Sequence, residues 1–257
     1  MNQLSLSIEE LIYCFYSEGF FEQGNALKQV YFGDLDDEKM DLLLQITCRS
    51  LLAKNVLSYK DHKFTLIPEL SEVISILNFS ELSIKGSRHS AAAEEESLSF
   101  HFGKNRIIQH VLQYDEQVHT FTSVELDEVS RILGEFYHVG TEPVLSDSSC
   151  SLTQEEFEEL LSILEDNNKQ FDRPTFHGEK ELFYRILKET NGLLNTLLFL
   201  EFNDQKEPVA KNVVMFTNKQ EQNWQIEKTD GLFNVKPCNQ SMIQRLLEEN
   251  VMVYQKR

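Results

Sequence analysis

Glycine, proline, tryptophan and cysteine are scarce in this chain of 257 residues, with 10, 5, 1 and 4 copies respectively. So little glycine and proline argues against long disordered or fibrous segments. The cysteines are scattered without any CxxC spacing, which excludes a disulfide framework and a zinc knuckle. We therefore expect reduced thiols in a cytoplasmic protein, at Cys14, Cys48, Cys150 and Cys238.

Basic residues are also few, with 24 Lys and Arg against 42 Asp and Glu, so the formal net charge is −18. Binding to nucleic acid or to an anionic membrane needs clustered Lys and Arg, so neither is expected as the main partner. The longest apolar stretch, residues 193–202, contains Asn195 and Glu201 and is too short to cross a bilayer. The first residues lack a basic region followed by an apolar run, so no secretory signal is predicted.

Motifs that carry catalytic chemistry are missing as well. The sequence has no GxGxxG, GxxxxGK[ST], HExxH or GxSxG motif and no EF-hand loop. Carboxylate pairs are frequent, but a chain with 42 acidic residues forms them by chance on solvated helix faces. We expect no enzyme, no catalytic residue, no cofactor and no bound metal. An enzyme whose site carries no recognisable motif is the alternative.

Two capping boxes mark helix starts, one at Ser7 and Glu10 and one at Thr153 and Glu156. Each opens a similar order of expected elements, with helices first, then four strands and a closing helix. This order predicts an α+β fold in which two quasi-repeated halves contribute strands to a central antiparallel sheet flanked by helices. The halves are residues 1–139 and 152–257, joined by a linker at 140–151, in one compact domain with an internal pseudo-two-fold. The first half is longer, and its extra segment is expected within residues 36–77.

Three histidines are expected on one face of the sheet. If residues 104–105 and 115–116 form tight turns, the alternation of side chains places His101, His110 and His119 together with Ile108 and Phe121. Three histidines could bind Zn²⁺. No carboxylate lies obviously beside them, so the interpretation favours a polar sheet face over a metal site. The opposite face, with Phe100 and Ile107, is expected to be the core side.

Residues 36–67 combine a helix with a short hairpin, which resembles half of a winged helix. DNA binding would need an excess of basic side chains on the exposed face. Basic and acidic residues are equally numerous in this segment, so a structural role is favoured over a DNA-binding regulator.

Two segments are candidates for contact with a partner. Residues 87–96 are expected to form an exposed loop between two strands, and such loops on a rigid sheet often carry recognition. The alternative is a plain connection without a binding role. The C-terminal stretch 242–254 gathers Met and aromatic residues near a helix end, which could dock a partner helix. The candidate binding residues are Ser87, Arg88, His89, Glu94, Glu95, Glu96, Met252 and Tyr254.

Three stretches carry a family resemblance: Leu-Ser-Leu-Ser-Ile-Glu-Glu-Leu at 4–11, Ser-Leu-Leu-Ala-Lys-Asn-Val-Leu at 50–57 and Phe-Thr-Leu-Ile-Pro-Glu-Leu at 64–70. With the strands that follow, the chain resembles the EspG family of type VII (ESX) secretion-associated proteins and the related Firmicute EssE/EsaE group. The resemblance implies a cytosolic, non-enzymatic chaperone or adaptor for helical secretion substrates of the WXG or LXG type. It also implies contact through residues 87–96 and the C-terminal helix. The alternative is an immunity protein, because strong acidity suits the masking of a basic toxin.

Overall fold

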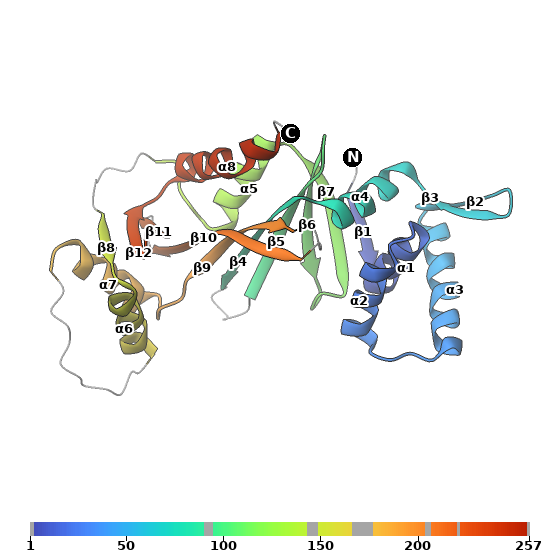
Figure 1. Ribbon diagram of the computed structural model, residues 1–257, viewed down its shortest axis with the longest axis horizontal. Helices are drawn as coiled ribbons and strands as arrows, with labels where there is room; N and C mark the ends of the chain where they lie inside the picture. The colour runs from blue at the N-terminus through green and yellow to red at the C-terminus, as the bar shows by residue number, and fades with distance from the viewer. Residues whose placement is uncertain are drawn as a thin grey trace. The chain divides into compact units, whose positions relative to one another are not determined.

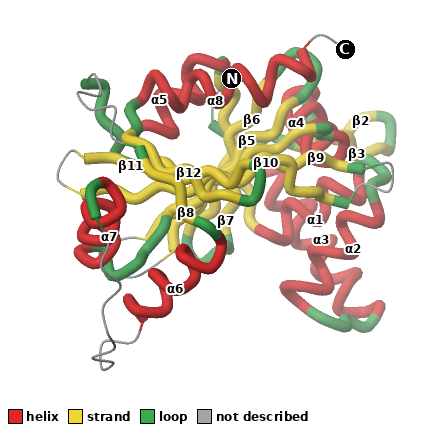
Figure 2. Tube along the Cα trace, turned by 60° about the vertical axis from the view of Figure 1, so that its left-hand side comes forward, coloured by secondary structure: helices red, strands yellow, loops and turns green. Residues whose placement is uncertain are grey.

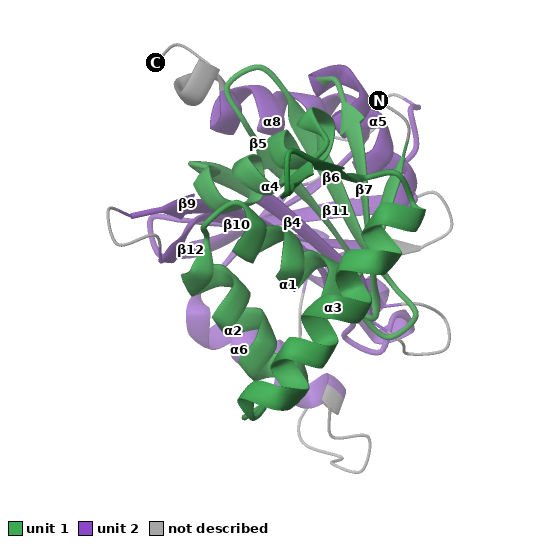
Figure 3. Cartoon of the chain, turned by 90° about the vertical axis from the view of Figure 1, so that its right-hand side faces the viewer, with its two compact units in different colours: residues 1–83, 98–125 green, residues 84–97, 126–257 purple. Residues whose placement is uncertain are grey.

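The computed structural model describes residues 3–89, 95–142, 149–165, 177–203, 207–219 and 222–255. The chain divides into two compact units (Figure 3). Unit 1 holds residues 1–83 and 98–125, and unit 2 holds residues 84–97 and 126–257. Two strands run through both units, β4 (Leu82–His89) and β5 (Glu95–Phe102).

The remaining elements follow in chain order (Figure 1). Unit 1 contains β1 (Leu4–Ser7), α1 (Ile8–Ser17), α2 (Phe21–Phe32), α3 (Asp37–Ala53), β2 (Leu57–Lys60), β3 (Lys63–Leu66), α4 (Pro68–Phe79), β6 (Ile107–Gln113) and β7 (Val118–Val124). Unit 2 contains α5 (Leu126–Phe136), β8 (Cys150–Leu152), α6 (Gln154–Glu165), α7 (Glu179–Glu189), β9 (Asn195–Phe202), β10 (Pro208–Lys219), β11 (Gln222–Thr229), β12 (Leu232–Pro237) and α8 (Gln240–Gln255).

Ten strands form one sheet in the order β1-β7-β6-β5-β4-β9-β10-β11-β12-β8, and β2 and β3 form a separate hairpin. Read inward from its two ends, the sheet repeats itself. β8, β12, β11, β10 and β9 take the places of β1, β7, β6, β5 and β4. The α+β fold with two quasi-repeated halves and an antiparallel sheet is therefore confirmed.

The extra segment of the first half consists of α2, α3, β2 and β3, because α4 precedes β4 as α7 precedes β9. The expected location within residues 36–77 was partly wrong, since the insertion starts earlier, at α2, and ends before α4. The local sequence could not show where the insertion begins and ends, because α4 and α7 occupy the same place in the order of elements but do not have similar sequences. The predicted division into residues 1–139 and 152–257, with a linker at 140–151, concerns the repeat and stays a prediction. The two compact units have different boundaries, because residues 84–97 belong to unit 2.

The core of unit 1 forms where α1, α3 and α4 cover one face of β1, β6 and β7. Apolar side chains of the helices pack against Leu6, Ile108 and Phe121 of the strands in one buried cluster. The helix members of the cluster are Leu11, Cys14, Phe15, Leu51, Leu70, Val73, Ile74 and Ile76.

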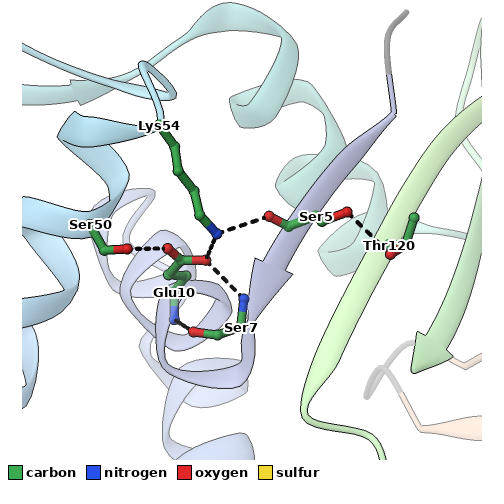
Figure 4. A network of polar contacts seen from close by, with 6 residues as sticks. All are labelled: Ser5, Ser7, Glu10, Ser50, Lys54 and Thr120. Carbon is green, nitrogen blue, oxygen red and sulfur yellow. Dashed lines mark hydrogen bonds and ion pairs between the residues drawn. The ribbon is translucent and has the colours of Figure 1, made fainter. Parts of the chain in front are cut away.

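Helix α1 is tied to α3 by a buried carboxylate (Figure 4). The Ser7–Glu10 capping box is formed as predicted, with Ser7 N–H donating to Glu10 Oε2 at 2.8 Å. Ser50 Oγ donates to Glu10 Oε1 at 2.7 Å, and Lys54 Nζ donates to Glu10 Oε2 at 2.6 Å. Lys54 also donates to the carbonyl oxygen of Ser5 at 3.2 Å. One glutamate therefore caps α1 and binds the end of α3.

In unit 2 the two faces of the strands are covered by different helices (Figure 2). Trp224, Ile226 and Val235 form a buried cluster with side chains of α6 and α7. Since side chains alternate along a strand, Gln225 and Glu227 point to the other face, where they meet α8. Helix α8 packs against α5, and a Cβ atom at Gly134 would lie only 3.3 Å from the side chain of Gln240. The predicted Thr153–Glu156 capping box is also formed.

Candidate functional site

Both described ends of the first predicted partner segment are strands, β4 and β5, which are neighbours in the sheet; we call this pair the β4–β5 hairpin. Ser87, Arg88 and His89 end β4, and Glu95 and Glu96 begin β5. The prediction of a loop over residues 87–96 was therefore wrong at both ends, because the polar residues continue the ladder. The predicted contact residue Glu94 lies outside the described residues. His89, Glu95 and Glu96 are exposed at the described end of the hairpin.

Arg88 fixes this hairpin to the end of α5. Its Nε donates to Glu96 Oε2 at 2.8 Å, and its Nη1 donates to the carbonyl oxygen of Phe136. Nη1 also lies 2.9 Å from Nε2 of His138, and the guanidinium carbon lies 4.8 Å from the centre of the Phe136 ring. Arg88 thus braces the hairpin across both strands, and its donors are already engaged within unit 2.

The strand next to β4 supplies further support. Ser87 Oγ and Thr196 Oγ1 are 2.7 Å apart, and the His89 N–H donates to Asn195 Oδ1 at 3.2 Å. Tyr137, which is fully buried, donates its hydroxyl to the carbonyl oxygen of Thr196 at 2.5 Å. Burial raises the pKa of the Tyr137 phenol, so it remains a neutral donor. The exposed polar residues His89, Glu95 and Glu96 therefore stand on a hydrogen-bonded base.

The second predicted segment is the C-terminal part of α8. Leu246, Leu247 and Val251 are buried, so they support the core. Met252 and Tyr254 fall within the helix, but their side chains lie outside the described residues. Their role in partner binding stays a prediction.

A shallow pocket lies between α8 and strands β11 and β12, and sequence reasoning did not find it. Glu227 and Lys236 pair across it at 3.0 Å. The remaining lining residues are Gln225, Met242, Arg245, Leu246 and Glu249. The pocket depends on how α8 packs on the sheet, and the only available signal was the spacing of Met242, Arg245 and Glu249 on one helix face.

The histidines share one face of the sheet, as predicted. His110 pairs with Phe121 and His101 pairs with Ile108 across the strands. The interpretation of this face as the polar side of the sheet was wrong, since Ile108 and Phe121 belong to the core cluster beneath α1, α3 and α4. His119 is also buried. Alternation assigns side chains to a common face, but helices elsewhere in the chain decide which face is covered.

The three rings are not arranged around a common point. His101 Nε2 lies 3.4 Å from His110 Nδ1, and His110 Nε2 lies 2.9 Å from His119 Nδ1. His110 uses one ring nitrogen for each neighbour, so the three rings cannot direct one nitrogen each at a single ion. Within the described ranges, no group of three or more His, Cys, Asp or Glu could hold a metal ion.

We expect the purified protein to contain no stoichiometric zinc, because the histidine nitrogens face one another in pairs. Elemental analysis after gel filtration checks this, with a known zinc protein carried through the same preparation as a control. About one zinc per chain that disappears in His110→Ala would contradict the described geometry.

The segment that resembled half of a winged helix is a helix followed by a hairpin, α3 with β2 and β3. Two of its lysines are paired with carboxylates, Lys39 with Asp36 at 2.7 Å and Lys54 with Glu10 at 2.6 Å. These pairs reduce the positive charge that a DNA backbone would meet, and they fit the structural role favoured from the sequence.

The fold is similar to that of a solved type VII secretion chaperone. The solved structure of the Mycobacterium tuberculosis chaperone EspG5, in complex with a PE25–PPE41 dimer, matches with a TM-score of 0.62 and 7% sequence identity. The match covers 98% of this chain and 96% of that chain, and it confirms the expected EspG-like fold. No helix within the described residues is long and apolar enough to cross a membrane.

The chain belongs to the YfjC family, whose model, described as "Uncharacterised protein YfjC", matches residues 3–247. A relative from Bacillus subtilis (strain 168), "Uncharacterized protein YfjC", is 33% identical over 255 residues. That match covers 97% of this chain and the whole of the relative.

Proposed function

We propose that this protein is a non-enzymatic chaperone that acts in the cytoplasm and binds a helical substrate of a type VII secretion system. The fold carries the proposal, because nearly the whole chain matches a chaperone of such a system. The substrate class we propose is the WXG or LXG type. Binding to such helices buries apolar surface, while charged rim residues set specificity and the rate of association.

The proposed contact surface is the end of the β4–β5 hairpin together with the C-terminal turn of α8. The exposed side chains of His89, Glu95 and Glu96 stand on a base held by Arg88 and Tyr137. A rigid base lowers the entropy lost when a partner binds. Met252 and Tyr254 are the apolar residues we propose for the helix.

Replacing residues 89–95 by Gly-Ser of equal length is expected to weaken capture of a co-expressed WXG or LXG protein from the same organism. The melting temperature should change little, because the replacement leaves Arg88 and the core intact. A double variant, Met252→Asp with Tyr254→Asp, is expected to weaken capture as well. Arg131→Met is the matched control, since Arg131 lies on α5 in an exposed pair with Glu135. If both variants capture the substrate at the wild-type yield, the contact lies elsewhere.

The second candidate is an immunity protein, favoured by the net charge of −18, which suits a basic toxin. The same capture experiment separates the two. A basic nuclease recovered in place of a secretion substrate, with its activity blocked, would replace the chaperone proposal.

A further inference from the structure

A continuous line of hydrogen bonds crosses the sheet of unit 1 through the three histidines. Ser83 Oγ lies 2.9 Å from His101 Nδ1, and the two histidine contacts of 3.4 and 2.9 Å continue the line to His119. In every ring Nδ1 faces the Ser83 end and Nε2 faces the His119 end. We call these four residues the histidine row.

The Ser83 end of the row leads to a backbone carbonyl oxygen, which can only accept a hydrogen bond. Ser83 Oγ is 3.3 Å from Ser80 Oγ, and Ser80 Oγ donates to the carbonyl oxygen of Leu82 at 2.5 Å. At the other end, His119 Nε2 is buried and has no hydrogen-bond partner. If every ring carries its proton on Nδ1, each N–H and O–H group in the row has an acceptor. The one group without a partner is then the lone pair of His119 Nε2. The opposite orientation would bury the Nε2–H of His119 without an acceptor, which costs more.

The second half shows that the fold does not need histidines at these places. Leu152 pairs with Phe233 as Leu6 pairs with His119, so Phe233 is the counterpart of His119. By the same register, Ile226 corresponds to His110 and Thr217 corresponds to His101. At the three histidine positions unit 2 thus has Phe233, Ile226 and Thr217, so the histidines of unit 1 are an addition to a common scaffold.

The row is held neutral by its surroundings. Burial lowers the pKa of His101 to about 4 and, together with the neighbouring histidines, lowers that of His110. Burial also lowers the pKa of His119, against a smaller opposing effect of Glu116 at the β6–β7 turn.

On the described helices over this face, the buried ionisable groups are either neutral or hydrogen-bonded. On α1, burial raises the pKa values of Tyr13 and Cys14, so both stay neutral. Three carboxylates of these helices have partners. These pairs are Glu10 with Lys54, Glu18 with Ser71 and Glu72 with Arg106, and β1 has no ionisable residue.

From this geometry we infer that the histidine row is an oriented hydrogen-bond chain with one proton-accepting atom, His119 Nε2, and that it acts as an acid-sensitive lock on unit 1. The other ring nitrogens are used within the chain, so a second proton can enter only when the row breaks. The unfolded chain has no such restriction and can bind three protons. Acid therefore favours opening of this face, and with it the release of β1, α1 and α4 from the strands.

The sign of the pH effect follows from linkage. Histidines in the unfolded chain gain protons as the pH falls below about 6.5, while His101 and His110 in the folded row do so only at lower pH. Each such histidine raises the unfolding equilibrium constant about tenfold for each pH unit between about 6.5 and its lowered folded pKa. We expect His101 and His110 together to approach a hundredfold per pH unit near pH 5, with His119 adding to this as long as its ring stays neutral.

The test compares the wild type with the variant His101→Thr/His110→Ile/His119→Phe, which carries the residues of the second half. Urea unfolding at pH 7.5, 6, 5 and 4.5 should show a much steeper loss of stability in the wild type. Carboxylates titrate in both proteins, so the difference between the two pH dependences of stability comes from the three histidines. His62→Asn, at the exposed β2–β3 turn, should keep the wild-type slope. Equal slopes in the wild type and the triple variant would overturn the inference.

A second measurement needs no variant. Nitrogen-15 NMR of the wild-type protein at pH 6 should show His101, His110 and His119 as neutral rings protonated on Nδ1. A ring protonated on Nε2, or one that titrates near pH 6.5, would contradict an oriented chain.

Discussion

Tyr137→Ala should lower the free energy of unfolding by about 3–5 kcal/mol, as expected for truncating a large buried aromatic side chain. Tyr137 is fully buried, its ring stacks on Phe216 with centres 4.8 Å apart, and its hydroxyl binds the Thr196 carbonyl. A Cβ atom at Gly86 would lie only 2.7 Å from the Tyr137 hydroxyl oxygen, so the surroundings fit this side chain closely. Equilibrium unfolding in urea, followed by a spectroscopic signal from unit 2, measures this loss of stability.

Tyr137→Phe separates packing from the hydrogen bond. It keeps the ring and removes the hydroxyl, so the expected cost is only about 1 kcal/mol. If the two variants lose the same stability, the hydroxyl rather than the ring holds α5 to β9. The phenylalanine variant should still capture substrate, because Arg88 continues to brace the hairpin.

Lys54→Met should lower the free energy of unfolding by about 2–3 kcal/mol. The substitution leaves Glu10 buried without its cation, and an uncompensated buried charge is expensive. The value stands below that of a fully buried pair because the Lys54 side chain is 43% exposed. Ser7 and Ser50 still donate to the carboxylate, which limits the loss.

The double variant Glu10→Gln/Lys54→Met should regain most of this stability, since no buried charge remains. The second half supplies a matched control in Lys180, which pairs with Glu156 of the other capping box at 2.6 Å. There the two side chains are 32% and 38% exposed, so Lys180→Met should cost only about 0.5–1 kcal/mol. A larger loss from Lys180→Met than from Lys54→Met would show that burial does not set the difference.

Local signals in the sequence predicted much of the fold. A capping box needs only residues three apart, so both helix starts could be read from the chain. The order of elements after Ser7 and after Thr153 then revealed the repeat. Pairing register also followed from short turns, which is why His101, His110 and His119 were assigned to one face correctly.

Such local signals could not predict how segments far apart in the chain pack against one another. Both faces of β5, β6 and β7 carry apolar residues, with Phe100 and Ile107 on one side and Ile108 and Phe121 on the other. Alternation therefore could not tell which face lies under the helices. The same limit explains Arg88, whose partners Phe136 and His138 are far along the chain and gave no reason to expect a brace.

The two outermost strands of the sheet have a consequence for behaviour in a crowded cell. β1 has four residues and β8 has three, and each runs directly into the capping residue of a helix, Ser7 before α1 and Thr153 before α6. An unfolded chain that tried to add a strand would find only a few backbone groups before a helix blocked it. Both ends of the ladder thus offer only short templates, which disfavours open-ended strand addition to this sheet.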